Sequence, residues 1–294
     1  MTLKGIYSPI VTPFTNEKVN LSYFEENIVQ WNSSTLSGYV VFGSTGESVH
    51  LTDAEKIDLL KSAKRMASPE KVLIAGTGKA STQQTIAFTN MAAEAGAEFA
   101  LVITPYFYKK QQNDTMMLAH FSTVADRSEI PVIIYNVPKF TNVDLQKSVI
   151  CKLAQHPNIV GIKDSSGNIH KITEVIEETP DDFTVLLGNA SLLLPGLLMG
   201  ADGAILALCN MAFKQVTEIY DACCAQSYAI AKHKFTALMP LIQSILNTYG
   251  IPGIKAAMDM VGFHGGEVRK PLLPLDSRSL ENIKSILKTS QLIS

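Results

Sequence analysis

The residue with the clearest chemical potential is Lys163, in the segment GIKDSSG at residues 161–167. It ends a short apolar run, and a turn rich in serine and glycine leads from it into a helical pattern. This order predicts a strand, a loop and a helix, with Lys163 at the carboxyl end of a buried strand. Burial disfavours the charged form of a lysine and lowers its pKa, which suits Schiff-base formation with a carbonyl substrate. The alternative is a surface lysine just past a strand end, with a structural role only.

Two further segments place matching chemistry at strand ends. Tyr135 ends another apolar run, where its phenol can pass protons to and from a carbinolamine or can simply cap the core. Residues 43–47, GSTGE, predict a tight turn in which backbone N–H groups and the hydroxyls of Ser44 and Thr45 suit a carboxylate, although an ordinary glycine turn has the same pattern. Together, these residues predict a 2-oxo acid bound covalently to Lys163 as an imine. The imine is the electron sink for making or breaking a carbon–carbon bond, so no cofactor and no metal is expected.

Eight short apolar runs that alternate with helical patterns must position these residues. The candidate strands cover residues 5–11, 38–42, 72–76, 99–104, 131–135, 159–163, 183–187 and 203–207. This order predicts an α/β fold, a (β/α)8 TIM barrel, in which chemistry gathers at the carboxyl ends of the strands. The residues expected to bind substrate also include Gly188 and Asn189, after the seventh strand, and Ile205, in the eighth.

The rival fold is a doubly wound open sheet with a phosphate-binding loop. Residues 76–81, GTGKAS, resemble part of such a loop but lack its first glycine and the serine or threonine after the lysine. They are better interpreted as a strand-to-helix turn in which Ser81 caps the helix. Helical patterns continue after the last strand, at residues 213–224, 229–248, 253–261 and 279–287. The last three predict a C-terminal helical extension, with the barrel at 1–225 and the extension at 226–294.

Composition excludes several classes of partner. The chain has 294 residues, a net charge of −2 and no basic run, so neither nucleic acid nor an anionic membrane is an expected partner. The four cysteines match no zinc pattern, and the six histidines form no pair with metal-ligand spacing. The cysteines are interpreted as reduced thiols, and the first residues contain no signal peptide pattern. We expect a cytoplasmic protein, or one of the mitochondrial matrix if a presequence has been removed.

Four sequence motifs resemble those of the pyruvate-dependent class I lyases of the dihydrodipicolinate synthase and N-acetylneuraminate lyase superfamily. The motifs are SPIVTPF at 8–14, GSTGE at 43–47, YNVP at 135–138 and GIKD at 161–164, and the resemblance covers the whole chain. It implies that Lys163 forms the Schiff base, that Tyr135 and Ser44 complete the catalytic set, and that Ser44 and Thr45 hold the carboxylate of pyruvate. It also implies a homotetramer of barrels.

Departures from the family pattern bear on the substrate. Dihydrodipicolinate synthases usually carry an arginine at the place of Phe140 and a tyrosine at that of Phe107, and N-acetylneuraminate lyases carry an Asp-Glu pair in the loop at 188–192. Segments 156–165, 250–255 and 271–275 resemble 4-hydroxy-2-oxoglutarate aldolase, which implies cleavage to pyruvate and the aldehyde glyoxylate. The 2-keto-3-deoxy sugar acid aldolases are the first alternative, and dihydrodipicolinate synthase is the next. A non-catalytic barrel that binds 2-oxo acids is the alternative from another class.

Overall fold

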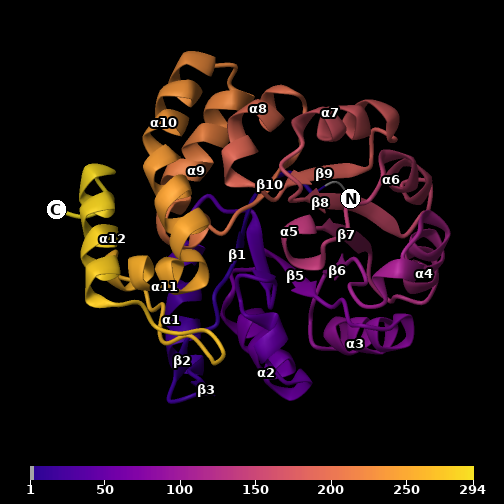
Figure 1. The fold of residues 1–294 in the computed structure, drawn as a ribbon, viewed down its shortest axis with the longest axis horizontal. Helices are drawn as coiled ribbons and strands as arrows, with labels where there is room; N and C mark the ends of the chain where they lie inside the picture. Colours follow the sequence, from indigo (N-terminus) through magenta and orange to yellow (C-terminus); the bar gives the residue numbers. More distant parts are fainter. Residues whose placement is uncertain (1–2) are drawn as a thin grey trace. The chain divides into compact units, whose positions relative to one another are not determined.

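A computed structural model describes residues 3–294 and contains a closed barrel of eight parallel strands (Figure 1). Around the barrel, the strands follow one another in the order β1, β10, β9, β8, β7, β6, β5, β4. Their bounds are Gly5–Pro9 (β1), Gly38–Val41 (β4), Val72–Gly76 (β5), Phe99–Ile103 (β6), Val132–Asn136 (β7), Ile159–Asp164 (β8), Thr184–Leu187 (β9) and Gly203–Ile205 (β10). The expected (β/α)8 barrel is therefore confirmed, with the first and last strands two residues shorter than predicted.

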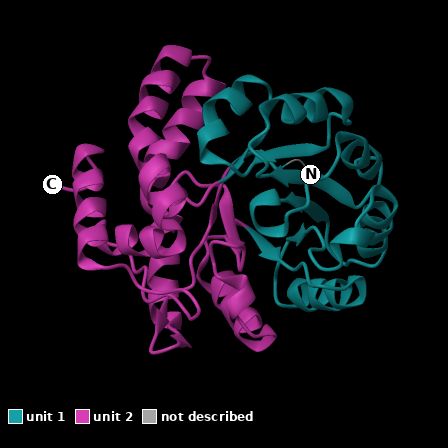
Figure 2. Cartoon of the chain, in the orientation of Figure 1, with its two compact units in different colours: residues 1–5, 73–205 teal, residues 6–72, 206–294 magenta. Residues whose placement is uncertain are grey.

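Backbone contacts divide the chain into two compact units (Figure 2). Unit 1 comprises residues up to 5 together with 73–205, and unit 2 comprises residues 6–72 and 206–294. Lys163 and Tyr135 belong to unit 1, whereas Ser44 and Thr45 belong to unit 2. The boundary expected between residues 225 and 226 separates the barrel from its C-terminal extension, which is not the division that the backbone contacts make. That boundary stays a prediction.

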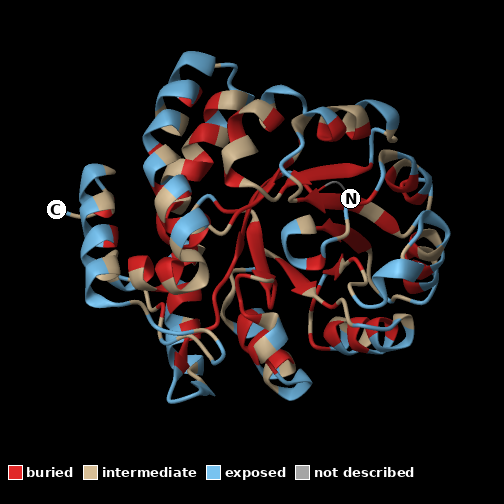
Figure 3. Cartoon of the chain, in the orientation of Figure 1, coloured by how far each residue is buried: buried red, intermediate tan, exposed pale blue. Residues whose placement is uncertain are grey.

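In unit 1, buried strands are followed by helices that are buried on one side only (Figure 3). All five residues of β7 are buried, as strands of a parallel sheet covered on both faces should be. The side chain of Ser81 caps the helix that follows β5, which confirms the interpretation of residues 76–81. The helices of this unit are Thr82–Glu94 (α3), Asp114–Asp126 (α4), Pro138–Thr141 (α5), Lys147–Leu153 (α6), Ile169–Glu178 (α7) and Leu193–Leu198 (α8).

Unit 2 contains β1, β4, a short hairpin and the helices of both chain ends. The hairpin pairs Phe14–Thr15 (β2) with Lys18–Val19 (β3). The helices are Leu21–Asn32 (α1), Asp53–Met66 (α2), Cys209–Cys224 (α9), Tyr228–Pro240 (α10), Gly250–Met260 (α11) and Ser277–Thr289 (α12). The last three helices form the expected C-terminal extension.

The extension departs from the prediction at one place. The sequence predicts a single helix over residues 229–248, but α10 ends at Pro240 and a π-helix covers Leu241–Tyr249. Proline has no N–H to donate and its ring crowds the preceding turn, so a regular α-helix is interrupted there. Periodicity of apolar residues does not distinguish the wider π turn from an α turn over so few residues.

Candidate active site

Lys163 and Tyr135 lie side by side on neighbouring strands. They are register partners in the parallel pairing of β7 with β8, and the Lys163 Nζ lies 4.3 Å from the centroid of the Tyr135 ring. Each residue is only 6% exposed. Burial lowers the pKa of Lys163, and the Tyr135 phenol acts in the opposite direction. The structure thus brings together the predicted nucleophile and the predicted proton carrier.

Gly188 borders the Lys163 side chain. Its N–H donates to the Asp164 carbonyl oxygen at 2.7 Å. A methyl group at Gly188 would lie 2.0 Å from the Ser165 Oγ and 2.9 Å from the Lys163 Cε, so only glycine leaves room for both side chains. The Ser165 Oγ is buried and has no hydrogen-bond partner among residues 3–294. Gly188 therefore belongs to the immediate surroundings of the lysine, and its contact with a substrate stays a prediction.

Asn189 and Ile205 are the other two pocket residues expected in unit 1, and they lie after β9 and in β10. The Asn189 Oδ1 accepts from the N–H of Ser191 at 3.0 Å and so caps a short 3-10 turn. Ile205 is the last residue of β10 and is fully buried. Their contact with a substrate stays a prediction.

The predicted carboxylate cradle follows β4 in unit 2. Its tight turn is closed by a 3.0 Å hydrogen bond from the Gly46 N–H to the Gly43 carbonyl oxygen, and the Thr12 hydroxyl donates to the Gly46 carbonyl oxygen at 2.8 Å. Ser44 is half-buried and Thr45 is buried. The turn has the form that the glycine spacing predicts, and the binding of a carboxylate by these two residues stays a prediction.

Glu47 anchors this turn to distant parts of unit 2, which the motifs alone did not reveal. Its Oε1 lies 2.6 Å from the Lys255 Nζ in an ion pair whose side chains are 2% and 1% exposed. The same Nζ donates to the carbonyl oxygens of Thr12 and Glu267 at 2.7 and 2.6 Å. The backbone N–H of Arg269 donates to the Glu47 Oε2 at 3.1 Å. The sequence clue was a lysine within the mostly apolar segment of α11.

The aromatic residues after β6 are exposed. Phe107 is 61% exposed and Tyr108 is 80% exposed, with a backbone in the left-handed region. Because β6 ends at Ile103, the alternation of side chains along a strand does not apply at these positions. Phe140, at the place where the synthases usually carry arginine, is 58% exposed on the short helix α5.

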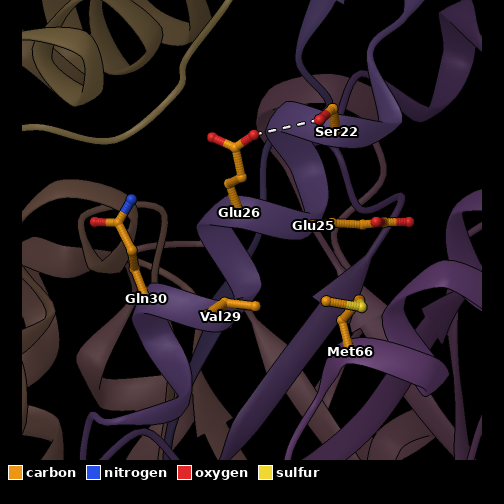
Figure 4. Close-up of a pocket in the computed structure, with 6 residues that line it drawn as sticks. All are labelled: Ser22, Glu25, Glu26, Val29, Gln30 and Met66. Carbon is orange, nitrogen blue, oxygen red and sulfur yellow. Dashed lines mark hydrogen bonds between the residues drawn. The ribbon is translucent and has the colours of Figure 1, made fainter.

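A surface groove in unit 2 is lined by none of these residues. It has a volume of about 370 Å³ and is lined by α1 and the end of α2 (Figure 4). Its lining residues are Ser22, Glu25, Glu26, Val29, Gln30 and Met66. Three of its four polar side chains already have partners, because Glu25 pairs with Arg65 and the Ser22 hydroxyl donates to Glu26. Nothing in the groove adds to the candidate site.

Within residues 3–294, no group of three or more histidine, cysteine or acidic side chains is arranged to hold a metal ion. In the same part of the chain, no helix has the length and apolar character needed to cross a membrane.

Comparisons with known proteins agree over nearly the whole chain. The model of the dihydrodipicolinate synthetase family matches residues 2–290. Among curated relatives, the 4-hydroxy-tetrahydrodipicolinate synthase of Macrococcus caseolyticus is 35% identical over 92% of this chain and 91% of its own. The enzyme of the same name from Methanococcoides burtonii is also 35% identical, over 97% of both chains.

Solved structures give the same result. A dihydrodipicolinate synthase of Bacillus anthracis has a TM-score of 0.94 and 30% identity, with all of both chains covered. That of Acinetobacter baumannii, a chloride-inhibited enzyme complexed with pyruvate, has a TM-score of 0.94 and 31% identity, covering 99% of this chain and all of its own. One similar structure is a monomeric variant, so the likeness alone does not establish an oligomeric state.

Proposed function

Because the chain belongs to the dihydrodipicolinate synthetase family, whose members are pyruvate-dependent Schiff-base lyases, we propose that it cleaves a 4-hydroxy-2-oxo acid to pyruvate and an aldehyde. The preferred substrate in this proposal is 4-hydroxy-2-oxoglutarate, with glyoxylate as the aldehyde. Lys163 is the nucleophile and Tyr135 the proton carrier, while Ser44 and Thr45 bind the carboxylate.

One observation supports the choice of Lys163 above all others. Five lysines in the described chain are buried, and four of them have a carboxylate or carbonyl oxygen as a partner: Lys56, Lys71, Lys171 and Lys255. Lys163 has no carboxylate within ion-pair distance among residues 3–294 and faces the ring of Tyr135 instead. A buried ammonium without an anion readily gives up its proton, so this lysine is the one suited to attack a carbonyl carbon.

The proposed cleavage begins when the Lys163 Nζ attacks C2 of the substrate and water leaves, forming an imine. The Tyr135 phenol gives its proton to the carbinolamine hydroxyl, which leaves as water. The resulting phenolate then accepts the proton of the C4 hydroxyl, and the bond between C3 and C4 breaks as its electrons move into the imine. The aldehyde departs, C3 of the resulting enamine is protonated, and water releases pyruvate from Lys163.

Phe140 counts against the synthase reaction, whose second substrate is usually held through its carboxylate by an arginine at this place, and the carboxylate of glyoxylate would need donors other than residue 140. A phenylalanine cannot form the paired hydrogen bonds with which arginine binds a carboxylate. The second candidate is synthesis of 4-hydroxy-tetrahydrodipicolinate, which the names of the relatives favour. Because those relatives are synthases, the resemblance to 4-hydroxy-2-oxoglutarate aldolase stays a prediction, as does the homotetramer.

Reductive trapping tests the proposal. The protein is mixed with pyruvate and borohydride, and the adduct is located by peptide mapping and mass spectrometry. We expect one adduct, on Lys163, and none in Lys163→Ala. Tyr135→Phe should still be trapped but should lose about 10²–10⁴-fold in cleavage. A folded protein that forms no adduct in excess pyruvate would overturn the aldolase and favour the non-catalytic barrel.

Substrate assays then separate the candidates. Pyruvate release is compared for 4-hydroxy-2-oxoglutarate and for 2-keto-3-deoxy sugar acids, beside an assay for 4-hydroxy-tetrahydrodipicolinate formation. The proposal expects the highest kcat/KM with 4-hydroxy-2-oxoglutarate. Efficient formation of 4-hydroxy-tetrahydrodipicolinate, with weak cleavage of the other two, would replace our choice with the second candidate.

A further inference from the structure

The residues that follow Tyr135 and Lys163 point to the opposite face of the sheet. Successive side chains of a strand alternate between its two faces. Asn136 and Asp164 are the next register pair of β7 and β8. They are 0% and 3% exposed, so both are buried on the side away from the Lys163–Tyr135 pair. Two polar side chains buried there require partners.

Asp164 finds partners for both of its oxygens. Its Oδ1 accepts from the backbone N–H of Ser166 at 2.8 Å and also from the Ser166 hydroxyl. Its Oδ2 accepts from the Asn136 Nδ2 at 2.8 Å and lies 3.2 Å from the Lys171 Nζ. Every group that faces this carboxylate is therefore a donor, which only a side chain with two acceptor oxygens can satisfy.

Two more residues close the cluster from outside the strands. Lys171, in the first turn of α7, is buried and pairs with Asp144 as well as with Asp164. Asp144, in the loop between α5 and α6, accepts from the Asn136 Nδ2 at 2.8 Å. The Asn136 Oδ1 accepts from the backbone N–H of Leu145 at 3.1 Å. We call Asn136, Asp144, Asp164 and Lys171 the clamp.

Backbone hydrogen bonds connect the clamp to the lysine. The Ser165 N–H donates to the Asn136 carbonyl oxygen at 2.8 Å, which ties the chain after β8 to the end of β7. The Gly188 N–H donates to the Asp164 carbonyl oxygen at 2.7 Å. Lys163 directly precedes Asp164, whose carbonyl oxygen accepts one of these bonds. The clamp therefore fixes the position of the Lys163 Cα relative to Tyr135.

A buried ionic cluster is rarely the most stable way to fill this space, since well-packed apolar residues of similar volume often do as well or better. Its retention beside two reacting side chains calls for another reason. A displacement of about 1 Å in a reacting group lowers a rate about a hundredfold. We propose that Asp164, Lys171 and Asn136 are positioning residues, which hold the Lys163 Nζ in the geometry over Tyr135 that imine formation needs. This inference rests on the proposed role of Lys163.

Asp164→Asn is the sharpest variant, because it keeps the shape of the side chain and removes one acceptor. The NH2 group of the new asparagine is itself a donor, and it must face either the donors of Ser166 or those of Asn136 and Lys171. Lys171→Met is the second variant, and leaves two carboxylates without their cation. The matched control is Asn158→Ala, which loses hydrogen bonds from the Asn158 Nδ2 to the carbonyl oxygens of Ala125 and Ser128 at the opposite end of the same strands.

The experiment measures the rate of imine formation by quenched borohydride trapping across a range of pyruvate concentrations, with folding followed by circular dichroism. For both clamp variants we expect a maximal rate about tenfold to a hundredfold below that of the wild type, with a half-saturating pyruvate concentration within about twofold. Asn158→Ala should unfold more readily yet trap pyruvate at the wild-type rate.

Folded clamp variants that trap pyruvate at the wild-type rate would overturn the inference. An equal loss of rate in Asn158→Ala would also overturn it, because the clamp would then act only through the general stability of the fold. The proposed function fails in a different way, because the wild type would then form no adduct on Lys163.

Discussion

Lys255→Met tests whether the cradle turn depends on a buried charge pair. The Lys255 side chain is 2% exposed, and its Nζ contacts the Glu47 Oε1, two carbonyl oxygens and, at 4.6 Å, the centroid of the Phe14 ring. Methionine has a similar length and no charge, so the packing against Phe14 is largely kept. What the substitution removes is the cation that faces Glu47.

The expected loss of stability follows from that burial. Removal of one partner of a buried ion pair leaves an uncompensated charge and costs about 3–5 kcal/mol. Unfolding free energies of ordinary proteins are about 5–15 kcal/mol, so the variant loses a large fraction of its stability. Burial lowers the pKa of Lys255 to about 8, and at pH 7 the lysine is still charged, so the measurement at that pH reports on the intact pair.

Urea denaturation at pH 7 measures the effect, with Lys234→Met as the control. Lys234 pairs with Glu218 at 2.8 Å on an exposed face of the same unit, so its loss should cost less than about 1 kcal/mol. Glu47→Gln combined with Lys255→Met removes both buried charges and should cost less than the sum of the single changes. A Lys255→Met variant as stable as the Lys234→Met control would refute the reasoning.

Three further predictions concern unit 1. Gly188→Ala places a methyl group 2.0 Å from the Ser165 Oγ and 2.9 Å from the Lys163 Cε, so it should lower the unfolding free energy by about 1–3 kcal/mol and slow trapping; wild-type values of both would contradict this. Because burial lowers the pKa of Lys163, the trapping rate should rise with pH and level off below 10.5, and a rate still rising at that pH would argue against a neutral buried amine. Burial lowers the pKa of His120 to about 4, so between pH 6.5 and 4 only the unfolded chain gains a proton there. Stability should fall by up to about 3 kcal/mol as the pH drops through this window, and His120→Gln should flatten the curve measured by urea denaturation at each pH.

The barrel and the proximity of Lys163 to Tyr135 were predictable because their signals are local. Each strand is a short apolar run, and several helix starts carry their own cap, such as Thr52 with Glu55, which form a capping box at α2. Once eight such units follow in order, the topology places the carboxyl ends of neighbouring strands together. Lys163 and Tyr135 end two successive strands, so their proximity follows from the barrel.

The anchor of the cradle turn was not predictable in this way. Lys255 donates to the Thr12 carbonyl oxygen across 243 positions of sequence, and nothing in either neighbourhood specifies the other. An alternating or helical pattern determines which face a residue occupies, but not which distant residue meets it there. The π-helix after Pro240 escaped prediction for a related reason, since one extra residue per turn hardly changes an apolar pattern over nine residues.

Lys163 and Asp164 show most clearly where sequence reasoning stops. Both end the same apolar run, and a motif such as GIKD treats them as one unit. In the structure, the strand turns them to opposite faces, so the lysine meets a phenol and the carboxylate meets four donor groups. If the two environments were exchanged, the proposed reaction would be lost, because a lysine beside a carboxylate keeps its proton and cannot attack a carbonyl carbon. In the proposed mechanism, Lys163 can react because its side chain leaves the strand on the face opposite Asp164, and we propose that the pairing of Asp164 with Lys171 maintains this separation.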